Sequence, residues 1–265
     1  MYYLSACLIA KNEGRYLPEW LCFHRLMGIE HFYIFDNNST DNTLEILRPS
    51  IDAGWVTYIP WKAHPGQLLA YDYAVKSFQN ETKWMAFIDA DEFLYGVETE
   101  DLKEVVSEFE EFSGLAAFWK IFGDSHHEKR PEGLVIANYT WRAPDHFLPN
   151  GHPKSIVKMD EALHPKNPHF FITKKNTVKE DKAIIAPHLP TPQKQWSYKK
   201  IAVNHYFTKS AQDSLEKRNR GLATVSSDDP RFIRSQAIFT SHNRNDIKDE
   251  TLARYAERIN NMIAA

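Results

Sequence analysis

The run from Trp84 to Phe93 constrains the fold of this chain more than any other stretch. Five apolar residues are followed at once by three carboxylates, Asp89, Asp91 and Glu92. An apolar run this short predicts a strand buried on both faces, and open α/β sheets bind ligands at the carboxyl ends of such strands. If strand geometry continues, Asp89 and Asp91 share one side, where two oxygen ligands suit Mg²⁺ or Mn²⁺. The alternative is an ordinary polar exit from strand to loop.

The composition is that of a globular protein large enough for a full core. Of the 265 residues, 43% are apolar and 25% are charged, and the net charge is −3. This charge argues against a protein that binds nucleic acid by neutralising phosphates. Cys7 and Cys22 lie in apolar segments, so we expect two reduced core thiols rather than a disulfide. The sequence has no recognisable transmembrane run or signal peptide, which favours a cytoplasmic protein, with a luminal domain lacking its anchor as the alternative.

Strand and helix patterns alternate through the first half of the chain. The apolar spacing predicts strands at 4–10, 31–35, 55–59, 84–88 and 114–122. It predicts helices at about 17–28, 42–48, 66–79 and 102–112. Such alternation implies an α/β fold with a doubly wound, mostly parallel sheet flanked by helices.

The second half of the chain is less regular. Residues 123–192 mix Gly, Pro, His and aromatic residues, which is typical of short strands and long loops. A final helix is predicted at about 249–263, with Leu252, Tyr255 and Ile259 on its apolar face. We expect this face to pack on the body of the protein, and a peripheral membrane contact is the alternative.

Polar side chains follow the first two predicted strands. The first strand ends at Ala10-Lys11-Asn12-Glu13 and the second at Asp36-Asn37-Asn38. Neighbouring strand ends form a polar lip suited to a nucleotide, with amides and carboxylates for base and ribose and Lys11 near phosphate. Capping of the following helices is the alternative role for these side chains. The sequence contains neither G-x-G-x-x-G nor a P-loop motif, so a bound diphosphate needs another positive clamp, and a divalent metal supplies one.

Further segments occur in a set order along residues 3–222. They are Lys11-Asn12-Glu13, Glu19-Trp20, residues 32–41, Gln67 with Ala70-Tyr71, residues 84–94, residues 119–123, residues 154–157 and residues 204–210. Each segment alone is weak, but the ordered set with its D-x-D is fairly specific. In this set the chain resembles the family-92 and family-2-type glycosyltransferases of GT-A fold.

The resemblance implies a nucleotide-sugar donor, a metal at the D-x-D and usually inversion at the anomeric carbon. Many members of the family-92 group use UDP-galactose. We therefore expect a metal-dependent hexosyltransferase, galactose favoured, that acts on a glycan or lipid-linked saccharide. The expected organisation is one GT-A-like domain over residues 1–265, with a nucleotide-binding half at 1–122 and an acceptor-side half with the final helix at 123–265.

The resemblance also implies roles for individual residues. Asp89 would meet the ribose and the metal, and Asp91 would ligate the metal directly. GT-A enzymes often take a further ligand, commonly His, from a late loop. His205 is our candidate, and imidazole favours Mn²⁺ over Mg²⁺. A hydrogen-bonded core histidine is the alternative, and the weaker candidates are His164, His169 and His188. The expected donor-binding residues are Ala10, Lys11, Glu13, Asp36, Gln67, Asp89 and Lys154.

The leaving group and the acceptor need further residues. Lys154 and Lys209 are candidates to neutralise the diphosphate. An acceptor hydroxyl is a poor nucleophile, so a carboxylate near the anomeric carbon would act as general base. By analogy with inverting GT-A enzymes this base follows the strand after the D-x-D, where Asp124 and Glu128 lie. Asp145 is a further candidate, and each of these is also a common kind of surface carboxylate.

Two other function classes use some of the same residues. A metal-dependent phosphoester hydrolase would hold its metals with these carboxylates, but a second acidic motif is missing from the sequence. A non-catalytic nucleotide-sugar-binding module is the third alternative. For a transferase, the acceptor is open between a bacterial lipopolysaccharide or capsule sugar and, for a trimmed luminal domain, a Golgi glycan.

Overall fold

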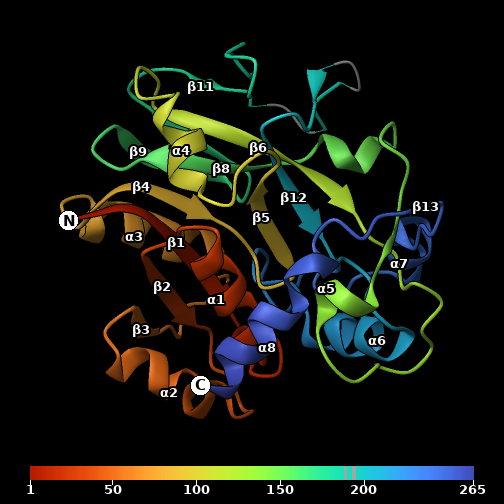
Figure 1. Ribbon diagram of the computed structural model, residues 1–265. Coiled ribbons are helices and arrows are strands. Elements are labelled where there is room, and N and C mark those ends of the chain that lie inside the picture. Colours follow the sequence, from red (N-terminus) through yellow and green to blue (C-terminus); the bar gives the residue numbers. More distant parts are fainter. Residues whose placement is uncertain (188–189, 193–194) are drawn as a thin grey trace.

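A central sheet with helices on both faces dominates the computed structural model, which describes residues 1–187, 190–192 and 195–265 (Figure 1). Its strand order is β3-β2-β1-β4-β8-β6-β12-β5, and β11 pairs with β6. The pairs β1–β2, β2–β3, β1–β4 and β6–β12 are parallel, whereas β8 and β5 run antiparallel to their neighbours. The strands of this sheet are β1 (Tyr2–Ala10), β2 (His31–Asp36), β3 (Val56–Pro60), β4 (Thr82–Phe87), β5 (Glu92–Gly96), β6 (Gly114–Ile121), β8 (Pro153–Lys158), β11 (Thr177–Val178) and β12 (Ile201–His205).

Helices and two small ribbons complete the described fold. The ribbons are β9 (Ala162–Asn167) with β10 (Phe170–Thr173) and β7 (Trp141–Arg142) with β13 (Ile247–Lys248). The helices are α1 (Leu17–Leu26), α2 (Thr43–Asp52), α3 (Gln67–Phe78), α4 (Leu102–Ser107), α5 (Val135–Asn138), α6 (Ala211–Arg220), α7 (Gln236–His242) and α8 (Ala256–Ala264), with 3₁₀ turns at Leu148–Gly151 and Ala253–Tyr255.

Alternate residues of β1 face two different apolar layers. Leu8 belongs to the core shared with Trp20 of α1, whereas Cys7 belongs to the core shared with Tyr71 of α3. A strand with helices on both sides must be apolar on both faces, which explains its continuous apolar run. The α/β, doubly wound architecture predicted from the sequence is therefore confirmed, and both cysteines are buried and free as expected.

Two predicted helices are shorter in the structure. The helix expected at 102–112 ends at Ser107, and turns continue to 112, where the Glu110 carboxylate accepts a hydrogen bond from Tyr3. The final helix begins at Ala256 rather than near 249, because Asp249 is held by Arg142 at 2.7 Å beside the β7–β13 ribbon. Local contacts of these acidic side chains override the helical spacing of the apolar residues.

Helix α8 packs on the body of the protein, as its apolar spacing predicted. Ile259 and Tyr255 are buried, and the Tyr255 ring meets Phe23 of α1 edge-on at 5.9 Å. Figure 1 shows α8 beside α1 near the C-terminus. No helix in the described part of the chain has the length and apolarity to cross a membrane.

Glu19 joins the two halves of the chain. Its carboxylate accepts hydrogen bonds from the buried backbone amides of Val135 at 2.7 Å and Ile136 at 2.9 Å, at the start of α5. Burial raises the pKa of Glu19 to about 7, although the two hydrogen bonds from the backbone act to lower it. The contact anchors the irregular second half onto α1.

Replacing Glu19 by Ala is expected to lower the free energy of unfolding by about 2–4 kcal/mol, because two buried N–H donors lose their acceptor. Urea unfolding monitored by circular dichroism measures this loss. Glu45→Ala, at an exposed position of α2, is the control and should leave the midpoint almost unchanged. Equal midpoints for Glu19→Ala and Glu45→Ala would contradict the anchoring role.

Candidate active site

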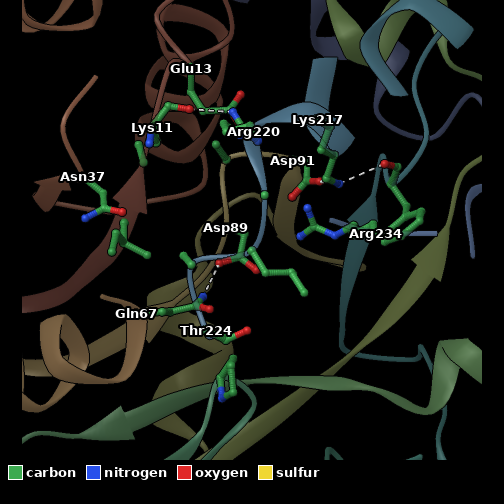
Figure 2. A pocket seen from close by; sticks show the side chains of 18 of the residues that line it. Lys11, Glu13, Asn37, Gln67, Asp89, Asp91, Lys217, Arg220, Thr224 and Arg234 are labelled. Carbon is green, nitrogen blue, oxygen red and sulfur yellow. Dashed lines mark hydrogen bonds and ion pairs between the residues drawn. The ribbon is translucent and has the colours of Figure 1, made fainter. Parts of the chain in front are cut away.

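A cavity of about 310 Å³ lies where β1, β2 and β4 reach their carboxyl ends. Ala10, Lys11 and Glu13 line it after β1, Asn37 after β2, and Asp89 and Asp91 after β4. Further lining residues come from α3, from the end of β12 and from α6 with the segment behind it, including Gln67, His205, Lys217, Arg220 and Arg234. Figure 2 shows those of them that it labels, among them Asn37, Asp91 and Arg220, converging from separate parts of the chain. The topology thus gathers the predicted lip and the D-x-D at one place.

The two Asp residues of the D-x-D lie in a tight turn. Strand β4 ends at Phe87, and the amide of Glu92 donates to the carbonyl of Asp89 at 3.0 Å. The indole of Trp20 donates to the carbonyls of Asp89 and Glu92 at 3.1 and 2.9 Å and so ties the turn to α1. The continued strand geometry that the sequence suggested is therefore wrong, although both Asp residues still border the cavity.

Protein donors already occupy both carboxylate oxygens of Asp89. Gln67 donates to Oδ1 at 3.0 Å, and Lys154 donates to Oδ2 at 3.0 Å. The ammonium of Lys154 also lies 3.2 Å from Glu92 Oε2. These two carboxylates raise the pKa of Lys154 despite its complete burial, so it is charged. Asp89 is thus held rigidly at the rim of the cavity.

Strand pairing explains why Lys154 reaches this position. Strand β8 runs antiparallel to β4 with Ile156 opposite Ala86, which brings Lys154 level with the start of the acidic turn. Lys154 is 1% exposed and is not among the residues that line the cavity. These contacts indicate that Lys154 positions Asp89. The contact of Lys154 with a diphosphate, which we expected from the sequence, stays a prediction.

Asp91 has different partners from Asp89. Lys217 of α6 donates to its Oδ2, and His205 Nε2 lies 3.4 Å from the same oxygen. His205 arrives there because β12 pairs with β5, with His205 opposite Glu92. Burial lowers the pKa of His205 to about 4, so its imidazole is neutral near pH 7. Burial alone would raise the pKa of Asp91, but Lys217 and His205 hold it well below its usual range.

Asp91 and His205 together fit a divalent cation. A carboxylate oxygen and the nitrogen of a neutral imidazole are both metal ligands, and His205 Nε2 lies 3.4 Å from Asp91 Oδ2. Both oxygens of Asp89 already accept hydrogen bonds from the protein, and its role as a metal ligand stays a prediction. Consistent with this, the described ranges contain no group of three or more His, Cys, Asp or Glu side chains able to hold a metal. The fit is that of a two-ligand site, with room for phosphate and water ligands.

Three cations of the cavity wall were missed by the sequence analysis. Arg220 pairs with Glu13 at 2.6 Å and donates to the Lys11 carbonyl at 2.6 Å. Lys217 pairs with Asp91, and Figure 2 shows Arg234 beside this pair. Arg234 makes no ion pair within the described part of the chain. The run of Lys217, Arg218 and Arg220 signals a basic helix end, but nothing local in the sequence places it against the D-x-D.

Asn37, rather than Asp36, faces the cavity. The Asp36 carboxylate accepts hydrogen bonds from the Tyr58 hydroxyl at 2.5 Å and from the Ser39 amide at 2.9 Å, and it is 7% exposed. Asn37 donates its Nδ2 to the carbonyls of residues 61 and 63 at 2.9 Å each, and Figure 2 shows its amide oxygen toward the cavity. The donor-binding role of Asp36 stays a prediction, and Asn37 is a neighbouring residue that the sequence analysis did not select.

The predicted general bases lie elsewhere. Asp124 borders a different cavity and accepts hydrogen bonds from Asn243 and Asn245. Glu128 is exposed, and Asp145 pairs with Arg142 on the surface. None of these carboxylates lines the cavity of Asp89 and Asp91 among the described residues. The assignment of the base therefore stays a prediction.

The weaker candidates fall in different places. His169 lines the cavity with its Nδ1 on the carbonyl of residue 153 at 2.9 Å, whereas His164 is exposed on β9. Lys209 lies over the Tyr16 ring at 3.7 Å and borders a second cavity of about 480 Å³. His188 lies outside the described residues.

An α/β sheet whose strand ends gather a D-x-D, a neutral histidine and a set of cations is the arrangement expected of a nucleotide-sugar-dependent transferase. The chain belongs to glycosyltransferase family 92, whose family model matches residues 6–263.

Three relatives are similar to parts of this chain. A family 92 glycosyltransferase protein of Oryza sativa subsp. japonica is 30% identical over 166 residues, covering 61% of this chain and 28% of the relative. The lipopolysaccharide core biosynthesis glycosyltransferase LpsC of Rhizobium meliloti (strain 1021) is 34% identical over 121 residues, which cover 44% and 41% of the two chains. The galactan β-1,4-galactosyltransferase GALS2 of Arabidopsis thaliana is 26% identical over 121 residues, covering 42% and 23%. This chain thus spans less than half the length of each.

Proposed function

We propose that this chain is a metal-dependent, inverting glycosyltransferase that moves a hexose, galactose favoured, from a UDP-sugar to a glycan hydroxyl. The observation that carries the proposal is the meeting of Asp91, the neutral His205 and the cations Lys217 and Arg234 in one cavity at the strand ends. Carboxylate and imidazole suit Mn²⁺, and the cations suit a diphosphate. Family membership supports glycosyl transfer in preference to ester hydrolysis.

The donor would lie across the ends of β1, β2 and β4. The amide oxygen of Asn37, which faces the cavity, suits a base N–H, and Lys11 and Glu13 line the same cavity. Asp89, fixed by Gln67 and Lys154, suits the ribose hydroxyls. The diphosphate would then meet Arg234 and Lys217. This placement follows the rule that open α/β sheets bind ligands at strand carboxyl ends.

Breaking the glycosyl–phosphate bond leaves negative charge on the nucleoside diphosphate. A divalent cation held by Asp91 and His205 would stabilise that charge as a Lewis acid. Arg234 and Lys217 would add positive charge at the same place, where low exposure strengthens their effect. A carboxylate, with Asp124 and Glu128 as the candidates from the sequence, would accept the proton of the attacking hydroxyl. Attack opposite the leaving group inverts the anomeric centre.

The similarity to a galactan galactosyltransferase supports galactose as the transferred sugar. The similarity to a lipopolysaccharide core glycosyltransferase supports a saccharide acceptor, glycan or lipid-linked. We propose cytoplasmic transfer at a membrane-associated acceptor, with a luminal enzyme as the alternative.

Turnover of UDP-galactose by the purified chain tests the proposal. We expect release of UDP with Mn²⁺, either by transfer to a saccharide or by slow hydrolysis, and its loss on addition of EDTA. NMR of the product should show the anomeric configuration opposite to that of the donor. Phosphate release from simple phosphoesters without donor turnover would favour the hydrolase, and nucleotide-sugar binding without turnover would favour the binding module.

A further inference from the structure

Lys217 occupies the place on Asp91 that a metal ion would take. Its ammonium donates to Asp91 Oδ2 and to the carbonyl of Phe207 at 2.9 Å, and it lies 4.5 Å from the centre of the Phe207 ring. His205 Nε2 reaches the same Asp91 oxygen at 3.4 Å. The side chains of Asp91 and Lys217 are only 10% and 14% exposed. One carboxylate oxygen thus serves both the ammonium and the imidazole in a nearly dry place.

A metal and this ammonium exclude one another. A small divalent cation binds a carboxylate oxygen at about 2.0–2.2 Å. At Asp91 Oδ2 the ammonium of Lys217 already takes this position. Two cations on one oxygen repel strongly where little water screens them. A metal held by Asp91 Oδ2 together with His205 Nε2 therefore requires Lys217 to leave that oxygen.

The surroundings of Lys217 allow it to leave without unfolding α6. The helix is fixed at its start by the Ser210–Asp213 capping box and near its end by the ion pair of Arg220 with Glu13. Lys217 lines both the cavity of about 310 Å³ and the neighbouring cavity of about 480 Å³. Its long side chain therefore has space on two sides while the backbone stays in place.

We propose that Lys217 is a built-in competitor of the divalent cation for Asp91, released when a diphosphate enters the cavity. The diphosphate gives the displaced ammonium a new anionic partner, and Asp91 with His205 then takes the metal. The chain accordingly binds metal weakly alone and more tightly with nucleoside diphosphate. The inference rests on the proposed function only in taking Asp91 and His205 as metal ligands.

Mn²⁺ binding to the nucleotide-free protein, followed by electron paramagnetic resonance, tests the competition directly. We expect Lys217→Gln to bind Mn²⁺ at least about tenfold more tightly than wild type, because the competing charge is gone. Lys217→Arg keeps the charge and should bind as weakly as wild type. Lys76→Gln is the control and should bind as weakly as wild type, because it removes one positive charge at an exposed position of α3 that does not line the cavity. Thermal unfolding of each variant confirms that the comparison is made between folded proteins.

A second titration in the presence of UDP measures the release. UDP should increase the Mn²⁺ affinity of the wild type by a larger factor than that of Lys217→Gln, because only the wild type has an ammonium to displace. Unchanged or weaker Mn²⁺ binding by Lys217→Gln would overturn the inference, as would an equal effect of UDP on both proteins. Absence of sugar transfer together with tighter Mn²⁺ binding by Lys217→Gln would refute the proposed function and leave the competition standing.

Discussion

Replacing Asp91 by Asn is expected to lower the turnover number for a UDP-sugar by about 10²–10³-fold, because the metal loses its charged ligand and the departing phosphate loses its main electrostatic stabilisation. The amide keeps the size of the carboxylate and an oxygen that can accept from Lys217. The backbone carbonyl of residue 91, which accepts from the Tyr206 amide at 2.8 Å, is not altered. The variant should therefore remain folded. Initial rates of UDP release at saturating Mn²⁺, with circular dichroism of the same sample, measure both effects.

Asp72→Asn provides the comparison for this variant. Asp72 lies on α3, where it pairs with Lys76 at 2.5 Å, and it is not among the residues that line the cavity. The Asp72→Asn substitution removes one negative charge, as Asp91→Asn does, and should leave turnover unchanged. Wild-type turnover in Asp91→Asn would rule out Asp91 as the metal ligand. Loss of turnover in both variants to the same extent would point to a general effect of net charge.

The sequence predicted those parts of the molecule that depend on local pattern. A continuous apolar run such as 84–88 can satisfy its burial only between two layers, so the strand and the sheet class follow from it. The ends of β1 and β2 lie side by side, with Ala10 opposite Asp36, as parallel pairing of consecutive strands requires. His205 was selected through the family resemblance, and it reaches the D-x-D because β12 pairs with β5.

Contacts that depend on strand order and on long-range docking could not be predicted. Asp91 and Lys217 are separated by 126 positions, and only the docking of α6 brings them together. Likewise, β8 lies in the half for which the sequence predicted only short strands and long loops, and nothing local says that it lies antiparallel beside β4. A side chain can also be diverted by one neighbour, as when Tyr58 and Ser39 take both oxygens of Asp36 and leave Asn37 to face the cavity.

Replacing Lys154 by Met should lower the free energy of unfolding by about 3–5 kcal/mol, because it leaves the Asp89 carboxylate without its cation. Burial raises the pKa of the neighbouring Glu92 to about 8, so Asp89 carries most of the uncompensated charge. Lys154 is 1% exposed and Glu92 is fully buried, so water cannot replace the lost charge. Methionine has nearly the same length, which keeps the packing term small. Urea unfolding measures the loss of stability. The affinity for UDP, measured by calorimetry, reports whether Asp89 still contributes to nucleotide binding.

Lys83→Met is the matched control, because Lys83 pairs with Glu110 at 2.7 Å on the surface, where its side chain is 34% exposed. Exposed pairs contribute at most about 1 kcal/mol, so this variant should unfold almost as the wild type does. Adding Asp89→Asn to Lys154→Met should recover part of the lost stability, since the uncompensated carboxylate charge is then removed. An equal, small loss in Lys154→Met and Lys83→Met would mean that the cation beneath the D-x-D is dispensable, and that Gln67 and the turn alone hold Asp89 at the cavity.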